Sequence, residues 1–189
     1  MKTKSRCWWC GDDPLLIDYH DKEWSVPLHD DRQLFELLLL EGFQAGLSWI
    51  TILRKRENFR KAFHQFDPER IAKFSRRDLD RLMNDAGIVR NRLKIEGSVQ
   101  NARAFLGIQR ERTFDRFLWQ FTGFKTRRDP GGMTREKIRA KSPESDAMSK
   151  ELARRGFKFV GSTICYAFMQ ATGMVDDHVE GCWRYRARR

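Results

Sequence analysis

The sequence predicts an all-α protein in which residues 1–189 form one compact domain, with room for two helical lobes. Three observations support this fold class. Apolar residues recur at helical spacing along most of the chain, between residues that typically start and stop helices. No segment shows the apolar–polar alternation of a half-buried strand, and no internal repeat is visible. The 14 Phe and 6 Trp supply the apolar side chains that a folded core needs.

The first half of the chain contains three predicted helices with recognisable ends. One runs through "RQLFELLLLEG" with Asp31 as its N-cap, and Gly42 and Gly46 bracket the loop after it. The next is "SWITILRKRENFRKAF", in which apolar residues again recur at helical spacing. "FDPERIAKF" starts a third, with Asp67 as the cap and Pro68 at the first helical position.

The second half continues in the same way. "SRRDLDRLMNDAGI" opens with a capping box formed by Ser75 and Asp78 and closes on Gly87. "NRLKIEGSVQNARAFLGI", "TFDRFLWQF", "SPESDAMSKELARRG" and "STICYAFMQATG" have helical patterns too. Between them, residues 125–141 lose all periodicity around a Pro-Gly-Gly turn and carry many Lys and Arg, which predicts a mobile basic loop. Residues 184–189 form a basic tail.

The composition favours a nucleic acid as the partner. A net charge of +11, from 37 Lys and Arg against 26 Asp and Glu, favours a polyanion because contacts to phosphates release counterions. No apolar run reaches the roughly 20 residues that span a bilayer, so no membrane association is expected. "MKTKSR" leads into Cys and Trp instead of an apolar signal core, which favours a cytoplasmic location. There the four cysteines are expected to be free or bound to metal.

The last two predicted helices are joined by "GFKFVGS". Two glycines in such a turn let helices cross closely and leave the amides at the start of the second helix facing outward. Gly161, Ser162 and Thr163 are therefore candidates for binding a DNA phosphate. The residues alone are equally compatible with an ordinary connection between helices.

Four collinear stretches resemble a known family. "DPLLIDYHDKEW", "LFELLLLEGFQAGLSWITIL", "RGFKFVGSTICYAFMQATG" and "DHVEGC" are similar to the 3-methyladenine DNA glycosylase I family of bacterial repair enzymes. The resemblance runs from about Arg6 to Cys182 and is weakest around residues 125–141. It implies a helix-hairpin-helix fold, hydrolysis of the N-glycosidic bond of 3-methyladenine in alkylated double-stranded DNA, release of the free base, and a structural zinc. A monomeric bacterial enzyme is expected.

The resemblance also assigns the zinc ligands, which lie near the two ends of the chain: Cys7, His20, His178 and Cys182. The last two are four residues apart, so one helical turn would put both on the same face. Two thiolates and two imidazoles complete a tetrahedral set, which predicts one structural zinc per chain that joins the N- and C-terminal segments. Cys10 forms a CxxC pair with Cys7 and is the alternative first ligand, although collinearity with the family favours Cys7.

The base pocket implied by the resemblance contains Glu41, Tyr19 and Trp49, with Trp9 close by. Electron-rich rings favour a cationic methylated base, and Glu41 is the candidate catalytic group that reads its edge. Without the family, Glu41 would be interpreted as a solvated charge at a helix end and the aromatic residues as core. Leu16 stands where some relatives have another aromatic, so that wall of the pocket is expected to differ.

A second candidate catalytic residue is Asp176, in "VDDHV". Many helix-hairpin-helix glycosylases have a catalytic Asp in a V-D-x-H pattern, at a position where this family often has Asn. Asp176 would either stabilise positive charge on the sugar or cap a short helix carrying His178, and both roles stay open. Relatives that cut the strand carry a Lys at the hairpin. "STI" stands there instead, so no Schiff base is expected and the base alone should be removed.

Two other functions fit parts of the sequence. A zinc-stapled DNA-binding module would use the same charge and hairpin, but would not need Glu41 beside an aromatic pair. A glycosylase for another alkylated base, such as 3-methylguanine or 7-methylguanine, would use the same parts.

Overall fold

The structure is a computed structural model that describes residues 4–128 and 132–185. The expectations for residues 129–131 of the basic loop and 186–189 of the basic tail therefore lie outside the described residues. The described helices are α1 (Pro14–Lys22), α2 (Asp31–Gln44), α3 (Trp49–Ala62), α4 (Pro68–Ile71), α5 (Arg76–Asn84), α6 (Arg92–Gln109), α7 (Phe114–Trp119), α8 (Pro143–Arg154) and α9 (Ser162–Ala171), and the strands are β1 (Arg127–Arg128) and β2 (Val175–Asp176). The predominantly helical fold is confirmed.

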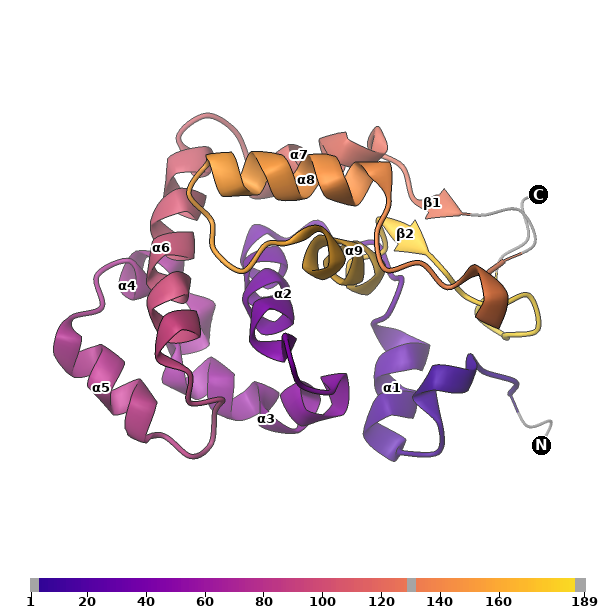
Figure 1. Cartoon of the computed structure of the whole chain (residues 1–189), viewed down its shortest axis with the longest axis horizontal. Helices are drawn as coiled ribbons and strands as arrows, with labels where there is room; N and C mark the ends of the chain where they lie inside the picture. The colour runs from indigo at the N-terminus through magenta and orange to yellow at the C-terminus, as the bar shows by residue number, and fades with distance from the viewer. Residues whose placement is uncertain (1–3, 129–131, 186–189) are drawn as a thin grey trace.

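The second helix, α2, lies at the centre of the molecule (Figure 1). It packs against α3, α6, α7 and α9. A helix surrounded by other elements should be apolar on most of its faces, and α2 buries Leu34, Phe35, Leu38, Leu39, Leu40 and Phe43. The main core is built around these side chains, so α2 is a rigid support for Glu41, which it also carries.

The start of α2 differs from the sequence prediction by one residue. Asp30 is the N-cap, because its carboxylate accepts a hydrogen bond of 2.9 Å from the Gln33 amide. The carboxylate of Asp31 instead accepts from the amides of Phe114 and Asp115, at 2.9 and 2.8 Å, and so satisfies the first turn of α7. The two adjacent aspartates thus serve two helices.

The end of α2 also differs from the prediction. The helix continues through Gly42 to Gln44 and does not stop at the glycine. A Cβ at Gly42 would lie 3.2 Å from Phe159 Cβ, so a residue without a side chain lets the α8–α9 connection approach α2 closely. The Lys94 ammonium group donates to the carbonyls of Phe43 and Ala45, at 2.9 and 2.6 Å. These contacts hold the end of α2.

The two predicted caps of the next helices are confirmed. The side chain of Asp67 accepts hydrogen bonds from Glu69 and Arg70 at the start of α4, where Pro68 is the first residue. Ser75 and Asp78 form the reciprocal capping box of α5. Both signals are local in sequence, which is why they could be identified without a structure.

Residues of α6 hold the connection between α8 and α9. The backbone of Phe159 has a φ of 57°, and its ring lies against Gly97, where a Cβ would come within 2.9 Å of the ring. The Asn101 side chain bonds to both backbone groups of Lys158, accepting from its N–H at 2.6 Å and donating to its carbonyl at 3.0 Å. The hairpin is therefore fixed on the core.

A small parallel sheet joins part of the expected basic loop to the C-terminal segment. Arg127 and Arg128 pair with Val175 and Asp176, and Gly132 forms a bridge to Val179. Two-residue strands are too short for the alternation that identifies strands in a sequence. The described part of residues 125–141 thus includes a paired strand, where the sequence predicted only a mobile loop.

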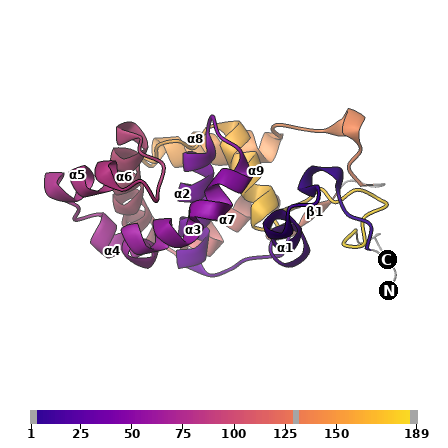
Figure 2. The same cartoon turned by 90° about the horizontal axis from the view of Figure 1, so that it is seen from below.

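The two ends of the chain meet. The first and last described segments lie at the same end of the molecule (Figures 1 and 2), and the Trp183 amide donates to the Ser5 carbonyl at 2.9 Å. A second, smaller apolar cluster forms there, from Cys7, Tyr19, Trp24, Leu53 and Cys182. Within the described segments, no helix is both long and apolar enough to cross a membrane.

Candidate functional site

The first helix, α1, supplies one residue to each of two neighbouring sites. It begins at Pro14 because the Asp13 carboxylate accepts a hydrogen bond from the Leu15 amide, at 2.9 Å. Tyr19 and His20 are consecutive and both buried. Successive residues of a helix project about 100° apart, so Tyr19 lines a cavity while His20 contacts the cysteines.

The cavity has a volume of about 210 Å³. It contains all four residues that the sequence assigned to the base pocket. The complete lining is Trp9, Tyr19, Trp24, Glu41, Gln44, Trp49, Ala167 and Gln170. Sequence reasoning missed Trp24, Gln44, Ala167 and Gln170, although all four lie within the stretches that resemble the family. Nothing local marks the α9 residues, because they reach the cavity through packing alone.

The aromatic side chains form two pairs in the cavity wall. The Trp9 and Trp24 ring centroids are 4.8 Å apart with planes at 69°, and those of Tyr19 and Trp49 are 5.4 Å apart at 53°. Within the described part of the chain, the indole N–H groups of Trp9 and Trp49 are buried without a hydrogen-bond partner. Such groups are costly unless water or a ligand satisfies them.

The carboxyl of Glu41 is the acidic group of the cavity and is 4% exposed. Burial raises its pKa to about 8, because removal from water disfavours the charged form. Burial also raises the pKa of Tyr19 well above its usual value, and the neighbouring Glu41 adds to this effect. The cavity is therefore an environment in which a cationic guest would stabilise the Glu41 carboxylate.

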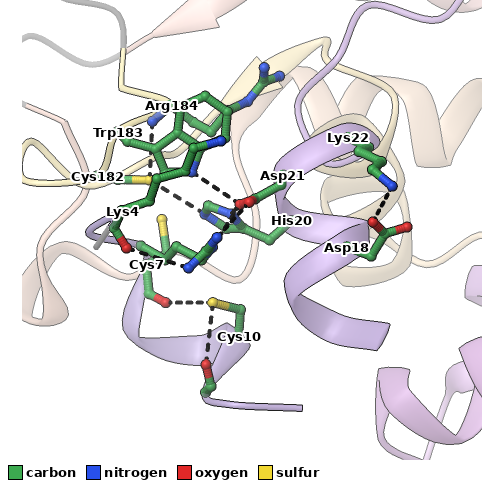
Figure 3. A network of polar contacts seen from close by, with 12 residues as sticks. Lys4, Cys7, Cys10, Asp18, His20, Asp21, Lys22, Cys182, Trp183 and Arg184 are labelled. Atoms are coloured by element: carbon green, nitrogen blue, oxygen red, sulfur yellow. Dashed lines mark hydrogen bonds and ion pairs between the residues drawn. The ribbon is translucent and has the colours of Figure 1, made fainter. Parts of the chain in front are cut away.

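Beside the cavity lies a cluster of metal-ligating side chains. Ligand atoms of Cys7, His20 and Cys182 lie within 4.8 Å of one another, and Cys182 Sγ is 3.4 Å from His20 Nε2. Figure 3 shows these side chains converging from the two ends of the chain. The Cys10 thiol instead donates to the Cys7 carbonyl, at 3.1 Å. Burial raises the pKa of the Cys7 thiol to about 12.

The fourth expected ligand, His178, lies next to this cluster, but it is not one of the three residues whose ligand atoms all lie within 4.8 Å of one another. Its ring centroid is 5.1 Å from that of His20. Its Nδ1 lies 2.7 Å from Asp176 Oδ1, while its Nε2 is buried and has no hydrogen-bond partner within residues 4–128 and 132–185. His20 has the same arrangement, with Nδ1 2.8 Å from Asp21 Oδ1. In both residues the carboxylate accepts from Nδ1–H, which leaves Nε2 with a free lone pair.

Ionic contacts hold the carboxylate beside His20. The Arg6 guanidinium donates to both oxygens of Asp21, at 2.9 and 2.8 Å. The indole of Trp183 donates to one of them, at 3.0 Å (Figure 3). These hydrogen bonds, that of Arg6 above all, hold the pKa of Asp21 well below its usual value. Burial lowers the pKa of His20, which keeps its ring neutral.

The segment from His178 to Cys182 is not a helix, contrary to the sequence prediction. Val179 pairs with Gly132, and the Cys182 amide donates to the Val179 carbonyl at 2.9 Å in a turn. A bridge and a turn, not a helix, therefore connect the two expected ligands. Gly132 is needed there, because its φ is 70° and a Cβ would lie 2.8 Å from the Glu180 amide.

The position of Asp176 bears on both roles that the sequence left open. It ends β2, is 8% exposed and does not line the cavity. One carboxylate oxygen accepts from His178, and the other accepts from Arg128 Nε at 2.7 Å. The short helix that it was expected to cap does not form. Instead, Asp176 orients His178 and ties it to the basic segment.

The candidate phosphate site lies at the start of α9. Gly161 and Thr163 are exposed, and no side chain caps the first amides of the helix. The Ser162 hydroxyl contacts the Ser145 hydroxyl at 2.9 Å, which joins the first turns of α8 and α9. The N-terminal amides of α9 therefore face solvent, as the sequence predicted.

Comparisons with known proteins agree with this geometry. Residues 9–185 match the model of the methyladenine glycosylase family. The chain is 51% identical over 181 residues to DNA-3-methyladenine glycosylase 1 of Escherichia coli, covering 95% of this chain and 96% of that protein. It is 48% identical over 179 residues to DNA-3-methyladenine glycosylase of Haemophilus influenzae, covering 94% and 96%.

Solved structures give the same result. A crystal structure of 3-methyladenine DNA glycosylase I superposes with a TM-score of 0.93 and 51% identity, covering 96% of this chain and 100% of that one. A Staphylococcus aureus enzyme, studied for its recognition of 3-methyladenine, superposes with a TM-score of 0.91 and 36% identity, covering 97% and 98%. The chain belongs to the methyladenine glycosylase family.

Proposed function

We propose that this protein removes 3-methyladenine from alkylated DNA by hydrolysing the bond between base and sugar. The observation that carries the proposal is the buried Glu41 carboxyl in an aromatic cavity. An empty cavity of about 150 Å³ holds benzene in other proteins, so about 210 Å³ is suitable for a methylated purine that has left the DNA stack. The similarity to glycosylases that are named for this base supports the choice of substrate.

Each group in the cavity has a use in this reaction. A 3-methylated adenine is cationic while it is attached to the sugar, so the aromatic faces attract it. Glu41 accepts from its amino edge and compensates its charge. The unpartnered indole N–H groups of Trp9 and Trp49 can donate to ring nitrogens. The positive charge makes the base a good leaving group, so selective binding supplies much of the catalysis.

Double-stranded DNA is the proposed macromolecular substrate. The α8–α9 connection acts as a helix-hairpin-helix element, whose exposed amides at Gly161, Ser162 and Thr163 bind a phosphate. The net charge of +11 favours the same partner. Phosphate contacts position the protein without reading sequence, which suits a repair enzyme that must act at any site.

We infer that Cys7, His20, His178 and Cys182 hold a structural zinc. In a tetrahedral zinc site the sulfur and nitrogen ligands are about 3.5 Å apart, and the Cys182 Sγ to His20 Nε2 distance is 3.4 Å. The buried His178 Nε2 has no other partner within the described residues. Zinc supplies the charge that stabilises the two thiolates. The carboxylates behind the imidazoles orient them, as is usual around zinc.

The reaction should end with removal of the base. Strand cleavage by this superfamily needs an amine at the reacting sugar, and the eight residues that line the cavity include no Lys. Lys94, the buried amine at the end of α2, donates to the Phe43 and Ala45 carbonyls. The product is therefore an intact strand with an abasic site, together with the free base.

Incubation with alkylated duplex DNA tests this function directly. Chromatography of the released bases should show 3-methyladenine, and the DNA should be cut only after alkali treatment. Release of 3-methylguanine or 7-methylguanine at comparable rates would indicate a broader glycosylase. Salt-sensitive DNA binding with no released base would indicate the DNA-binding module without catalysis.

A further inference from the structure

The cavity contains an amide whose orientation is fixed from outside. Gln170, near the end of α9, lines the same cavity as Glu41. Its Nε2 donates to Asp177 Oδ2, at 2.7 Å. An ionised carboxylate only accepts hydrogen bonds, so this contact requires the NH₂ group of the amide to face Asp177. The Gln170 oxygen, Oε1, is then the free acceptor of the side chain.

The carboxylate that sets this orientation is itself firmly placed. Asp177 follows β2 and is 5% exposed. The buried Tyr166 hydroxyl donates to the same oxygen, Oδ2, at 2.7 Å. Tyr166 and Gln170 lie four residues apart on α9, so one carboxylate bridges two consecutive turns of the helix. The Gln170 backbone is also held, because its carbonyl accepts from the Ser25 amide at 2.9 Å.

The consequence concerns which bases the cavity accepts. A purine with an amino group at position 6 presents a donor there, whereas a 6-oxo purine presents an acceptor. Glu41, through a carboxyl oxygen, and Gln170, through its free amide oxygen, both offer acceptors. When a 6-oxo purine binds, these acceptors face another acceptor and stay without a hydrogen bond. Buried polar groups without a partner discriminate strongly against the base that leaves them so.

We propose that Asp177 is a positioning residue that holds Gln170 with its amide oxygen available to the base, so that the cavity prefers 6-amino over 6-oxo purines. This inference rests on the proposed glycosylase function. It adds to that function a determinant of base selectivity from the C-terminal part of the chain, whereas Tyr19 and Glu41 come from α1 and α2 near its start.

A double-mutant cycle tests the proposal. The variants are Asp177→Ala, Gln170→Ala and the combination, with Gln170→Met as a variant of similar size and Gln100→Met, on the exposed surface of α6, as the matched control. Quenching of tryptophan fluorescence measures the affinities for free 3-methyladenine and for 3-methylhypoxanthine, which differ at position 6. Zinc content and melting temperature are recorded for each variant, because Asp177 adjoins His178.

Asp177→Ala should reduce the preference for 3-methyladenine by roughly three- to tenfold, the range expected for one hydrogen bond. It should have no further effect when Gln170 is already Ala, because it acts through that side chain. Equal losses for both bases, or equal effects of Asp177→Ala in both backgrounds, would overturn the proposal. If Asp177→Ala does not fold, Gln170→Met decides alone, and full retention of the preference would refute it. Wild-type excision of 3-methyladenine, measured in parallel, tests the underlying function independently.

Discussion

Replacing Glu41 by Gln should stabilise the protein while weakening its hold on the base. Burial raises the pKa of Glu41 to about 8, far above its value in an unfolded chain. Below about pH 4.5 the Glu41 carboxyl is protonated in both the folded and the unfolded protein. Between that pH and 8 only the folded state retains the proton, so the folded state binds more protons and its stability falls as pH rises.

The size of this effect follows from the shift. One pKa unit corresponds to about 1.4 kcal/mol, and the interval from about pH 4.5 to 7 spans about 2.5 units. Glu41 should therefore remove about 3 kcal/mol from the unfolding free energy over that interval. Gln has the same shape and does not titrate. The stability difference in favour of Glu41→Gln should then grow by about 3 kcal/mol between pH 4.5 and pH 7.

Urea denaturation at a series of pH values measures this difference, because it gives unfolding free energies directly. Glu36→Gln is the contrasting variant. Glu36 is a buried carboxylate of the same helix, but it is paired with the Arg60 guanidinium at 2.7 Å. Its replacement leaves Arg60 with only the exposed Glu57 as a partner and should destabilise the protein. If wild type and Glu41→Gln show the same slope of stability against pH, the pKa of Glu41 is not raised in the folded protein.

The same substitution should reduce binding of the base. A hydrogen bond to a charged group contributes about 1.5–3 kcal/mol, so excision of the cationic base should fall by roughly ten- to a hundredfold, and affinity for free 3-methyladenine should fall as well. An amide would also present a donor where the amino edge of the base needs an acceptor. A variant that gained stability but kept full affinity would place base recognition elsewhere in the cavity.

Four further substitutions test the neighbouring parts. Cys7→Ser should lose the bound metal and Cys10→Ser should keep it, as metal analysis of the purified proteins measures; the reverse result would exchange the two assignments. Asn101→Ala should weaken duplex binding and lower the unfolding free energy by about 1–3 kcal/mol, because both backbone groups of Lys158 lose their partner. Its affinity for the free base should not change, and a parallel loss there would contradict a role confined to the hairpin. Asp176→Asn should leave base affinity intact, whereas a large loss of single-turnover rate in a zinc-loaded protein would assign the chemistry to Asp176.

The sequence predicts the helices well because their ends are encoded by neighbouring residues. The capping box of α5 needs only Ser75 and Asp78, which are three residues apart. The prediction fails where a distant partner decides. Gly42 resembles a helix terminator, but it continues α2 because Phe159 approaches it from the hairpin. Asp31 resembles a cap, but its carboxylate bonds to α7, more than 80 residues away.

The candidate site also contains residues that the sequence could identify and residues that it could not. Glu41, Tyr19, Trp49 and Trp9 could be assigned through resemblance to the family, and the structure places all four around one cavity. Gln170 also lies within a stretch that resembles the family, but it was not assigned, because an amide on an apolar helix carries no signal of its own until its neighbours are known. The four-residue spacing of His178 and Cys182 suggested a helical turn, but a turn and a bridge form there instead.

The cavity and the metal cluster share their walls, and this changes what loss of the metal should do. The sequence alone suggests that removing zinc would lower stability and spare the chemistry of any protein that stays folded. However, the Trp24 ring centroid lies 4.6 Å from that of His178, and the Trp9 ring centroid lies 5.4 Å from that of His20. Two walls of the cavity therefore rest on the two imidazoles. Releasing them should loosen the surfaces that hold the base, so protein treated with a chelator below its melting temperature should lose affinity for 3-methyladenine as well as stability. Unchanged affinity in folded, metal-free protein would mean that the aromatic contacts hold the cavity without the metal.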